Sequence, residues 1–186
     1  EEEMRKNYQK KSFGTCGKIL LVIFAILVVA AAVQAESYQT LYSCLVDLSG
    51  WTGGEPTGMN MNMSGMVMIN STRTYSKGNK ELTVIIMKGN QAFGMAGMQG
   101  GGMQGSGMHM ETPEVKVNIK TINGFQVQTV YDKEENSGAV TVFLTHEQAG
   151  GAFFTLSYAG ISEKEALVLA KKFDWEKIKS KIQSLR

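Results

Sequence analysis

The feature that most constrains the fold is a run of alternating residues between positions 114 and 160. In Val115–Lys120, apolar residues alternate with lysine and asparagine, which is the period-two pattern of a strand with one buried face. Asn123-Gly124 follows, and this dipeptide is a strong hairpin signal because both residues tolerate positive φ. Similar alternation continues through 125–131, 140–144 and 154–158. The run therefore predicts an antiparallel meander.

Two further strands are expected before the meander. Met59–Tyr75 alternates, but the parity of its apolar residues changes at Ser64-Gly65, which indicates a bulge or a turn there. Glu81–Lys88 carries apolar residues on both parities, which predicts a central strand covered on two faces. Together with the meander, these segments predict a mainly antiparallel sheet of about six strands.

Helices are expected at both ends of this sheet. In residues 36–49, apolar side chains recur at helical spacing and end before Gly50. Near the C-terminus, Ser162 and Glu165 form a capping box, and Asp174 can cap a second helical segment. The predicted fold class is α+β, with an N-terminal helix and a C-terminal helix packed on the sheet.

Residues 1–35 have the pattern of an export signal. Basic residues precede the uncharged apolar run 19–33, and small residues at Val33 and Ala35 suit cleavage after Ala35. The run is shorter than the roughly 20 residues that cross a bilayer, which favours cleavage over retention as a membrane anchor. In either case residues 36–186 are expected to form one domain outside the cytoplasm, in the periplasm or the extracellular space. Membrane contact is expected only through 19–33, if that run is retained.

Charge and cysteine content exclude some classes of protein. Residues 1–35 hold five of the 19 basic and three of the 17 acidic residues, which leaves 14 of each in 36–186. A neutral domain lacks the basic footprint of a nucleic-acid-binding protein. Cys44 is the single cysteine after the signal, so the domain has no internal disulfide. We expect Cys44 to be a small buried side chain, with an intermolecular disulfide as the alternative.

Several motifs resemble a family pattern. Gly50-Trp51, the segments 73–75 and 77–80, the Asn123-Gly124 hairpin and the ending 160–178 are similar to those of a loose group of exported bacterial α+β proteins. The similarity covers most of residues 41–182. The group is largely uncharacterised, so the resemblance implies a fold and export but no activity. The Gly/Met-rich segment is where this chain departs from that pattern.

The sequence lacks the usual signatures of catalysis. Its two histidines, His109 and His146, lie outside any nucleophile motif, and no phosphate-binding loop or zinc spacing is present. The acidic residues are scattered over turns and helix surfaces. We therefore predict that the protein is not an enzyme, with a hydrolase that uses His146 as the weaker alternative.

Methionine is the residue type that stands out. Ten of the 12 methionines lie in residues 59–68 and 95–110. Thioether sulfur is a soft, neutral ligand, so clustered methionine selects Cu(I) or Ag(I) over Zn(II), Mg(II) or Ca(II). This pattern resembles the Met-rich motifs of exported copper-handling proteins. The candidate metal ligands are Met95, Met98, Met103, Met108, His109, Met110, Met66 and Met68.

Other interpretations of these methionines remain open. Met59, Met61 and Met63 share one strand parity, so we expect them to face the core. Residues 94–110 contain little but Gly, Met, Gln and Ser, which predicts a mobile loop between the second and third strands. That loop could hold a metal, offer an adaptable apolar surface, or be a low-complexity insert without a role.

The sequence therefore predicts an exported, non-catalytic binding domain whose Met-rich loop contacts a protein or an apolar ligand. The alternative is a Cu(I) or Ag(I) carrier of the cell envelope.

Overall fold

A computed structural model describes residues 38–63, 66–89, 107–145 and 151–185. Contacts divide the chain into residues 1–36 and 37–186, and all the described elements lie in the second unit. The predicted export signal falls outside the described residues. Among the residues that are described, no helix is long and apolar enough to cross a bilayer.

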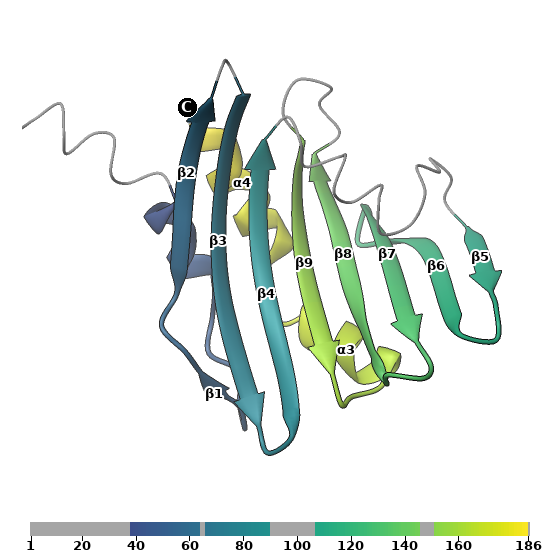
Figure 1. Cartoon of the computed structure of the whole chain (residues 1–186). Coiled ribbons are helices and arrows are strands. Elements are labelled where there is room, and N and C mark those ends of the chain that lie inside the picture. The colour runs from purple at the N-terminus through teal and green to yellow at the C-terminus, as the bar shows by residue number, and fades with distance from the viewer. Residues whose placement is uncertain (1–37, 64–65, 90–106, 146–150, 186) are drawn as a thin grey trace, which may run out of the picture. The chain divides into compact units, whose positions relative to one another are not determined.

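The described strands form one antiparallel sheet of nine strands (Figure 1). Its order is β1-β3-β4-β9-β8-β7-β6-β5, and β2 also pairs with β3. The strands are β1 (Thr52–Gly53), β2 (Thr57–Met63), β3 (Met66–Lys77), β4 (Lys80–Gly89), β5 (Met108–Glu111), β6 (Val115–Ile122), β7 (Phe125–Asp132), β8 (Ser137–Thr145) and β9 (Ala152–Ala159). The antiparallel sheet is as predicted, but it is larger than six strands.

The additional strands have identifiable origins. Residues 59–75 divide into β2 and β3, which pair with Met63 opposite Met66, so the parity change at Ser64-Gly65 marks a change of strand. The strands β1 and β5 have only two and four residues, which is too short for a period-two pattern to be recognised. Both are formed because longer neighbouring strands offer them free backbone groups.

The meander and its hairpin are confirmed. Strands β6, β7, β8 and β9 are consecutive neighbours, and β9 then pairs with β4. Asn123 and Gly124 both have positive φ, 51° and 81°, as a two-residue hairpin turn requires. Because β5 pairs with β6, four strands of the sheet separate β4 from β5.

The N-terminal α-helix predicted over residues 36–49 is not present. The chain forms instead a six-residue 3-10 helix, η1 (Gln39–Cys44), and Leu45 then leaves helical geometry. The guanidinium Nη1 of Arg73 donates to the Leu45 carbonyl at 2.6 Å, and the Tyr75 hydroxyl donates to the Val46 carbonyl at 2.8 Å. Side chains of β3 thus satisfy carbonyls that a longer helix would use itself.

The C-terminal helical region is confirmed as two helices, α3 (Glu163–Ala170) and α4 (Trp175–Ser184). The hydroxyl of Ser162 accepts a hydrogen bond from the Glu165 backbone N–H at 3.2 Å. The carboxylate of Asp174 accepts one from the Lys177 N–H at 2.9 Å. Both predicted caps therefore begin a helix.

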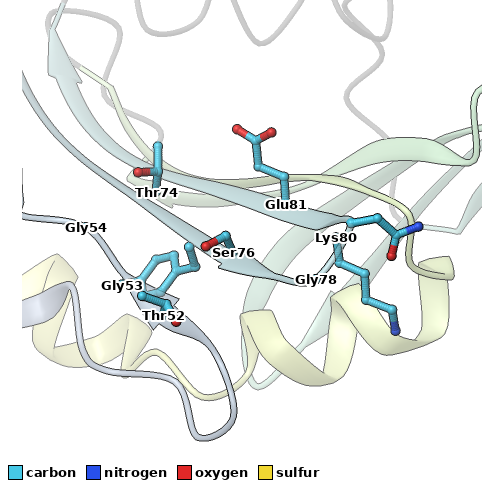
Figure 2. A pocket seen from close by; sticks show the side chains of 10 residues that line it. Thr52, Gly53, Gly54, Thr74, Ser76, Gly78, Lys80 and Glu81 are labelled. Atoms are coloured by element: carbon cyan, nitrogen blue, oxygen red, sulfur yellow. The ribbon is translucent and has the colours of Figure 1, made fainter.

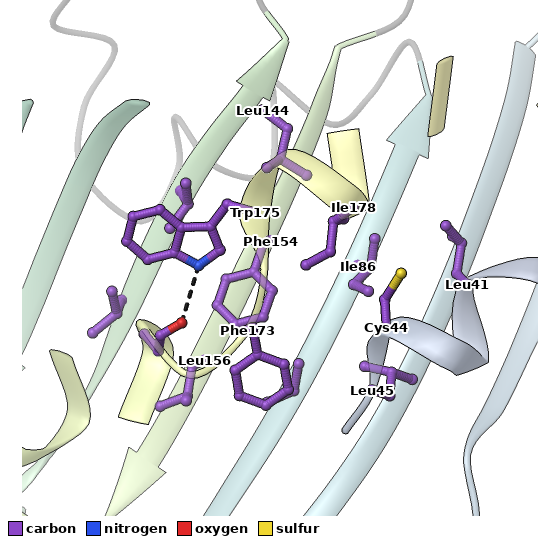
Figure 3. Close-up of a cluster of buried hydrophobic side chains, with 14 of the residues drawn as sticks. Leu41, Cys44, Leu45, Ile86, Leu144, Phe154, Leu156, Phe173, Trp175 and Ile178 are labelled. Atoms are coloured by element: carbon purple, nitrogen blue, oxygen red, sulfur yellow. Dashed lines mark hydrogen bonds between the residues drawn. The ribbon is translucent and has the colours of Figure 1, made fainter. Parts of the chain in front are cut away.

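All the described helices lie on one side of the sheet (Figure 1), and the main core lies between them and the strands. Phe173 contacts the rings of Tyr75 and Phe154, with centroid distances of 6.4 and 5.1 Å. The Trp175 indole N–H donates to the Ala170 carbonyl at 3.0 Å (Figure 3). The Trp175 ring packs edge-on against Phe125.

Cys44 belongs to this core and is 3% exposed, as expected for a small apolar side chain. Burial raises the pKa of its thiol, although the charges of Lys177 and Lys181 act in the opposite direction. A buried thiol with a raised pKa is a poor nucleophile for disulfide exchange. The position of Cys44 therefore argues against the intermolecular disulfide.

We predict that Gly138→Ala destabilises the sheet. A Cβ at Gly138 would overlap the Val130 carbonyl oxygen and would lie 2.9 Å from Cζ of Tyr158, whose ring covers this glycine. Overpacking of this kind lowers the free energy of unfolding by about 1–3 kcal/mol. Urea denaturation measures the change.

As a control, Tyr158→Phe keeps the ring and removes a hydroxyl that lies 3.5 Å from Val130 O, so it should have a smaller effect. Equal stability of Gly138→Ala and the wild type would contradict the prediction.

Candidate functional site

The side of the sheet opposite the helices is the candidate functional surface. The strand register identifies which side chains lie on this surface, because residues that are Cα partners in neighbouring strands point to the same side. A cluster of Met87 and Phe153, with Met68 and Ile85 packed against it, is separate from the main core. We call this surface the helix-free face; its residues include Met59, Met61, Met68, Ile85, Met87, Val117, Ile119, Gln128, Thr141, Phe153, Thr155, Met108 and Met110.

The helix-free face carries little charge. Among the described strand residues that point to this face, the charged ones are Glu81 and Asp132, and each lies at an end of its strand. The Asp132 carboxylate accepts hydrogen bonds from the backbone N–H groups of Glu134 and Glu135, so it is occupied within its own turn. The middle of the face is apolar or carries neutral hydroxyl and amide groups.

Methionines are exposed at both edges of this face. Met59 and Met61 on β2 are 47% and 37% exposed, and Met110 on β5 is 48% exposed. The expectation that Met59 and Met61 face the core was therefore wrong, and the side chain of Met63 lies outside the described residues. The period-two pattern shows that residues share a face, but it does not show which face. The even-numbered residues of β2 face the helices instead, and among them Gly58 lies against the Tyr38 ring.

The predicted metal ligands do not form one group in the described structure. In β5, strand alternation places Met108 and Met110 on the helix-free face and His109 on the other. His109 Nδ1 lies 2.6 Å from Asn118 Oδ1, and its Nε2 lies 3.3 Å from a carboxylate oxygen of Glu111. The imidazole is thus directed away from the two neighbouring thioethers.

The described methionines of the two Met-rich segments lie at opposite edges of the sheet. Met68 is on β3, and Met108 and Met110 are on β5, six strand positions away. Six spacings amount to about 29 Å along the sheet, which is too far for shared coordination. Met66 is in β3, but its side chain is not described. Met95, Met98, Met103 and His146 lie outside the described residues.

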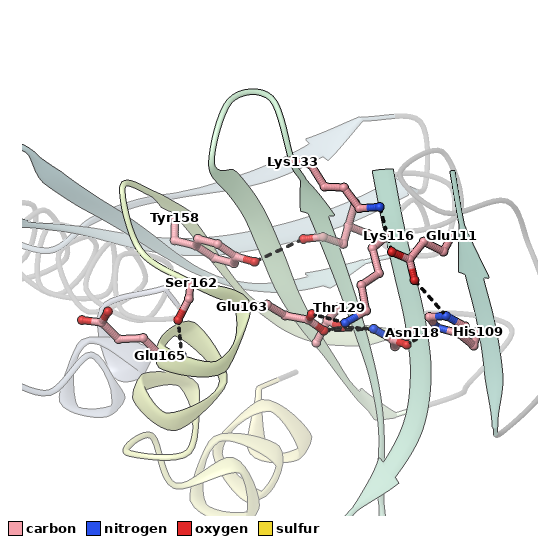
Figure 4. A network of polar contacts seen from close by, with 11 residues as sticks. His109, Glu111, Lys116, Asn118, Thr129, Lys133, Tyr158, Ser162, Glu163 and Glu165 are labelled. Atoms are coloured by element: carbon pink, nitrogen blue, oxygen red, sulfur yellow. Dashed lines mark hydrogen bonds and ion pairs between the residues drawn. The ribbon is translucent and has the colours of Figure 1, made fainter. Parts of the chain in front are cut away.

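A polar cluster on the helix side of the sheet was not recognised from the sequence (Figure 4). Glu163, the first residue of α3, accepts hydrogen bonds from Thr129 and Asn118 at 2.6 and 3.0 Å on one oxygen. Its other oxygen accepts from Lys116 Nζ at 2.9 Å. These contacts tie α3 to β6 and β7. The capping box marks Glu163 as a helix start, but its partners are more than 30 residues away.

The charge state of Glu163 follows from these contacts. Burial raises the pKa of its carboxyl, but the hydrogen bonds from Thr129, Lys116 and Asn118 and the charge of Lys116 outweigh burial, so the pKa is lowered. The same contact raises the pKa of Lys116. Because each carboxylate oxygen is already engaged, this cluster suits the positioning of α3 better than proton transfer to a substrate.

A row of buried polar side chains crosses the middle of the helix-free face. Gln128, Thr141 and Thr155 are Cα partners in adjacent strands, and all are at most 7% exposed. The hydroxyls of Thr141 and Thr155 lie 3.1 Å apart and hydrogen-bond to each other. The Gln128 amide Nε2 has no hydrogen-bond partner among the described residues. A buried, unpaired donor destabilises the fold, so this glutamine is unfavourable for stability.

A shallow hollow of about 470 Å³ lies where β1 meets the β3–β4 hairpin (Figure 2). Its lining includes Thr74, Ser76, Glu81 and backbone at Gly53 and Gly54. The lining contains neither histidine nor cysteine; its side chains include the hydroxyls of Thr52, Thr74 and Ser76 and the charged groups of Lys80 and Glu81. Across the described residues, no group of three His, Cys, Asp or Glu side chains gathers as metal ligands.

Comparisons with known proteins supply no further assignment. No protein-family model matches this chain, and neither the curated proteins nor the solved structures gave a match.

We predict that Glu163→Gln lowers stability in a pH-dependent manner. The folded-state pKa of Glu163 lies below its ordinary value, so its stabilisation is present above the unfolded pKa and is lost as pH falls through the folded-state pKa. The variant should lose about 1–2 kcal/mol of unfolding free energy at pH 7 and much less at pH 3. Urea denaturation at both pH values measures this loss.

Glu165→Gln is the control. It breaks only an exposed ion pair with Lys80, so it should lower the unfolding free energy by less than about 0.5 kcal/mol at pH 7. A loss for Glu163→Gln that is equal at pH 7 and pH 3 would contradict the prediction.

We also predict that Gln128→Met stabilises the domain. Methionine keeps a similar shape and removes the unpaired Nε2 donor, so the unfolding free energy should rise by about 1 kcal/mol. Gln126→Met is the matched control, because Gln126 lies two residues away on the same strand and side and is only partly buried. Thermal and urea denaturation test the pair, and a destabilised Gln128→Met variant would show that the amide has a partner.

Proposed function

We propose that this chain is an exported, non-catalytic interaction domain that binds an uncharged apolar ligand on the helix-free face. The observation that carries the proposal is that methionines are exposed at both edges of a sheet face whose described charges lie only at strand ends. They are Met59 and Met61 on β2 and Met110 on β5. Export is supported by the signal pattern of residues 1–35.

The distribution of charge favours an apolar ligand over an ionic one. The helix side holds the ion pairs of Lys116 with Glu163 and of Lys133 with Glu111, whereas the helix-free face has charge only at strand ends. A charged ligand would lose its hydration on this face without gaining an opposite charge. An apolar ligand would gain contact with Met61, Met68 and their neighbours.

Methionine is suited to such a surface because its unbranched, polarisable side chain adapts to ligands of different shape. Met61 and Met68 are Cα partners, and Met68 packs against the small cluster of Met87 and Phe153. The exposed thioethers at the edge are thus continuous with a buried apolar base. A ligand that contacts Met61 and Met68 would lie beside this base without meeting a charged side chain of the described face.

We predict that Met61→Lys weakens binding of an apolar probe. The probe is N-phenyl-1-naphthylamine, which is neutral and fluoresces when it enters an apolar site. Titrated into the full chain, it should bind the Met61→Lys variant about tenfold more weakly than the wild type, because one apolar contact is worth about 1.5 kcal/mol.

Asn60→Lys provides the matched control for this experiment. Asn60 is the neighbouring residue on β2, is also exposed, and points to the opposite side of the sheet. It introduces the same charge at the same edge, and it should leave the probe affinity unchanged. The apolar run 19–33 is present in every variant, so its contribution cancels. Equal effects of the two lysines, or no probe binding to the wild type, would overturn the proposal.

A further inference from the structure

The β2–β3 end of the helix-free face brings three thioethers together. Met61 and Met68 are direct Cα partners in the antiparallel pair, and Met59 lies two residues from Met61 on the same side. Cβ atoms of directly opposed residues are about 4.5–5.5 Å apart, and diagonal neighbours are still within reach of long side chains. Methionine has three rotatable bonds, so the three sulfur atoms can converge on one point.

The three side chains differ in depth. Met59 and Met61 are exposed to solvent, whereas Met68 is partly buried against Met87 and Phe153. An ion arriving from solvent could therefore meet the two exposed sulfurs first and then the deeper one. The apolar cluster beneath would exclude competing water from the inner side of the site.

The surroundings favour a soft ion. Among the described side chains, the neighbouring positions on the same side are Thr57 and Asn70, with Met87 and Gly89 on β4, and none carries a charge. The Asn70 side-chain oxygen already accepts a hydrogen bond from the Met59 backbone N–H at 3.1 Å. The hard ions Mg(II) and Ca(II) favour carboxylate oxygens, and the borderline ion Zn(II) favours imidazole, thiolate or carboxylate. The described side chains at these positions supply none of these groups.

We infer that Met59, Met61 and Met68 form a site for one Cu(I) or Ag(I) ion. Thioether ligands are soft and neutral, and they bind these monovalent ions without releasing protons. The affinity should therefore change little between pH 5 and pH 7, unlike that of a histidine or cysteine site. The site does not depend on apolar ligand binding, because coordination uses the sulfur atoms and not the apolar area.

The opposite edge of the same face offers a poorer arrangement. Met108 and Met110 lie on one strand, and their Cα partners on β6 are Ile119 and Val117. Neither partner supplies sulfur. His109, between them, points to the other side of the sheet and lies 2.6 Å from Asn118. This edge therefore serves as an internal comparison, with two thioethers that lack a cross-strand third.

The test is an NMR titration of the full chain, labelled with ¹³C at the methionine methyl groups, with Ag(I) in chloride-free buffer. Ag(I) is a redox-stable substitute for Cu(I), and single Met→Leu variants assign the resonances. The methyl signals of Met59, Met61 and Met68 should shift together and saturate with a single ion. Competition with a Cu(I) chelator under reducing conditions then gives the relative affinity of each variant.

Leucine substitutions separate coordination from packing. Met61→Leu/Met68→Leu keeps the apolar volume, so the fold should remain, while the Ag(I)-induced shift of Met59 should disappear. Even outer contacts of metal sites change affinity tenfold or more, so loss of two ligands should weaken this site by at least about tenfold. Met108→Leu/Met110→Leu should leave the three shifts unchanged.

Three outcomes would overturn the inference. They are no shift of the three methyl signals in the wild type, an unchanged Met59 shift in Met61→Leu/Met68→Leu, and loss of the three shifts in Met108→Leu/Met110→Leu. Failure here with intact probe binding would reject the metal site and leave the apolar surface standing. The reverse result would reject the apolar surface alone.

Discussion

Burial on one side of the sheet is the constraint on which the rest of the structure depends. Phe154 and Leu156 on β9 and Tyr75 on β3 are buried against the helices, and Phe173 and Trp175 close the core from the helix side. Burying large side chains of this kind contributes about 1.5–3 kcal/mol each. All the described helices pack on this side, so no described helix covers the opposite face.

Polar contacts then determine how the helices lie on that core. Arg73 and Tyr75 bind the Leu45 and Val46 carbonyls, which ends η1 early. Glu163 anchors the first turn of α3 to β6 and β7. At the other end, the Lys88 ammonium donates to carbonyls of Ile182 and Leu185, where a cation also suits the dipole of α4. These contacts join residues far apart in the chain and specify one arrangement of an otherwise nonspecific apolar interface.

The same alternation that builds the core also distributes the candidate ligands. On β5 it separates His109 from Met108 and Met110, so adjacent residues in the sequence serve opposite sides. On β2 and β3 it does the reverse and places Met61 beside Met68, residues seven positions apart in the chain. Residues that are adjacent in the sequence therefore do not form one site, whereas residues that are adjacent across strands can. Both proposed binding sites consist of residues that are adjacent across strands.

Local physical chemistry was sufficient for the features that the sequence determined by itself. Asn123-Gly124 specifies its hairpin because both residues tolerate positive φ, and Ser162 and Asp174 specify helix starts because their oxygens bind nearby N–H groups. Period-two alternation likewise located the long strands. The interactions involved span only a few residues, so the sequence contains the whole of each signal.

Tertiary structure decided which way each strand faces and which strands are neighbours. Alternation in β2 is equally consistent with Met59 and Met61 inside or outside, and the position of the helices placed them outside. The short strands β1 and β5 exist only because β3 and β6 present backbone groups to them. Long-range pairing depends on the combined burial of the whole sheet, and no local segment encodes that free energy.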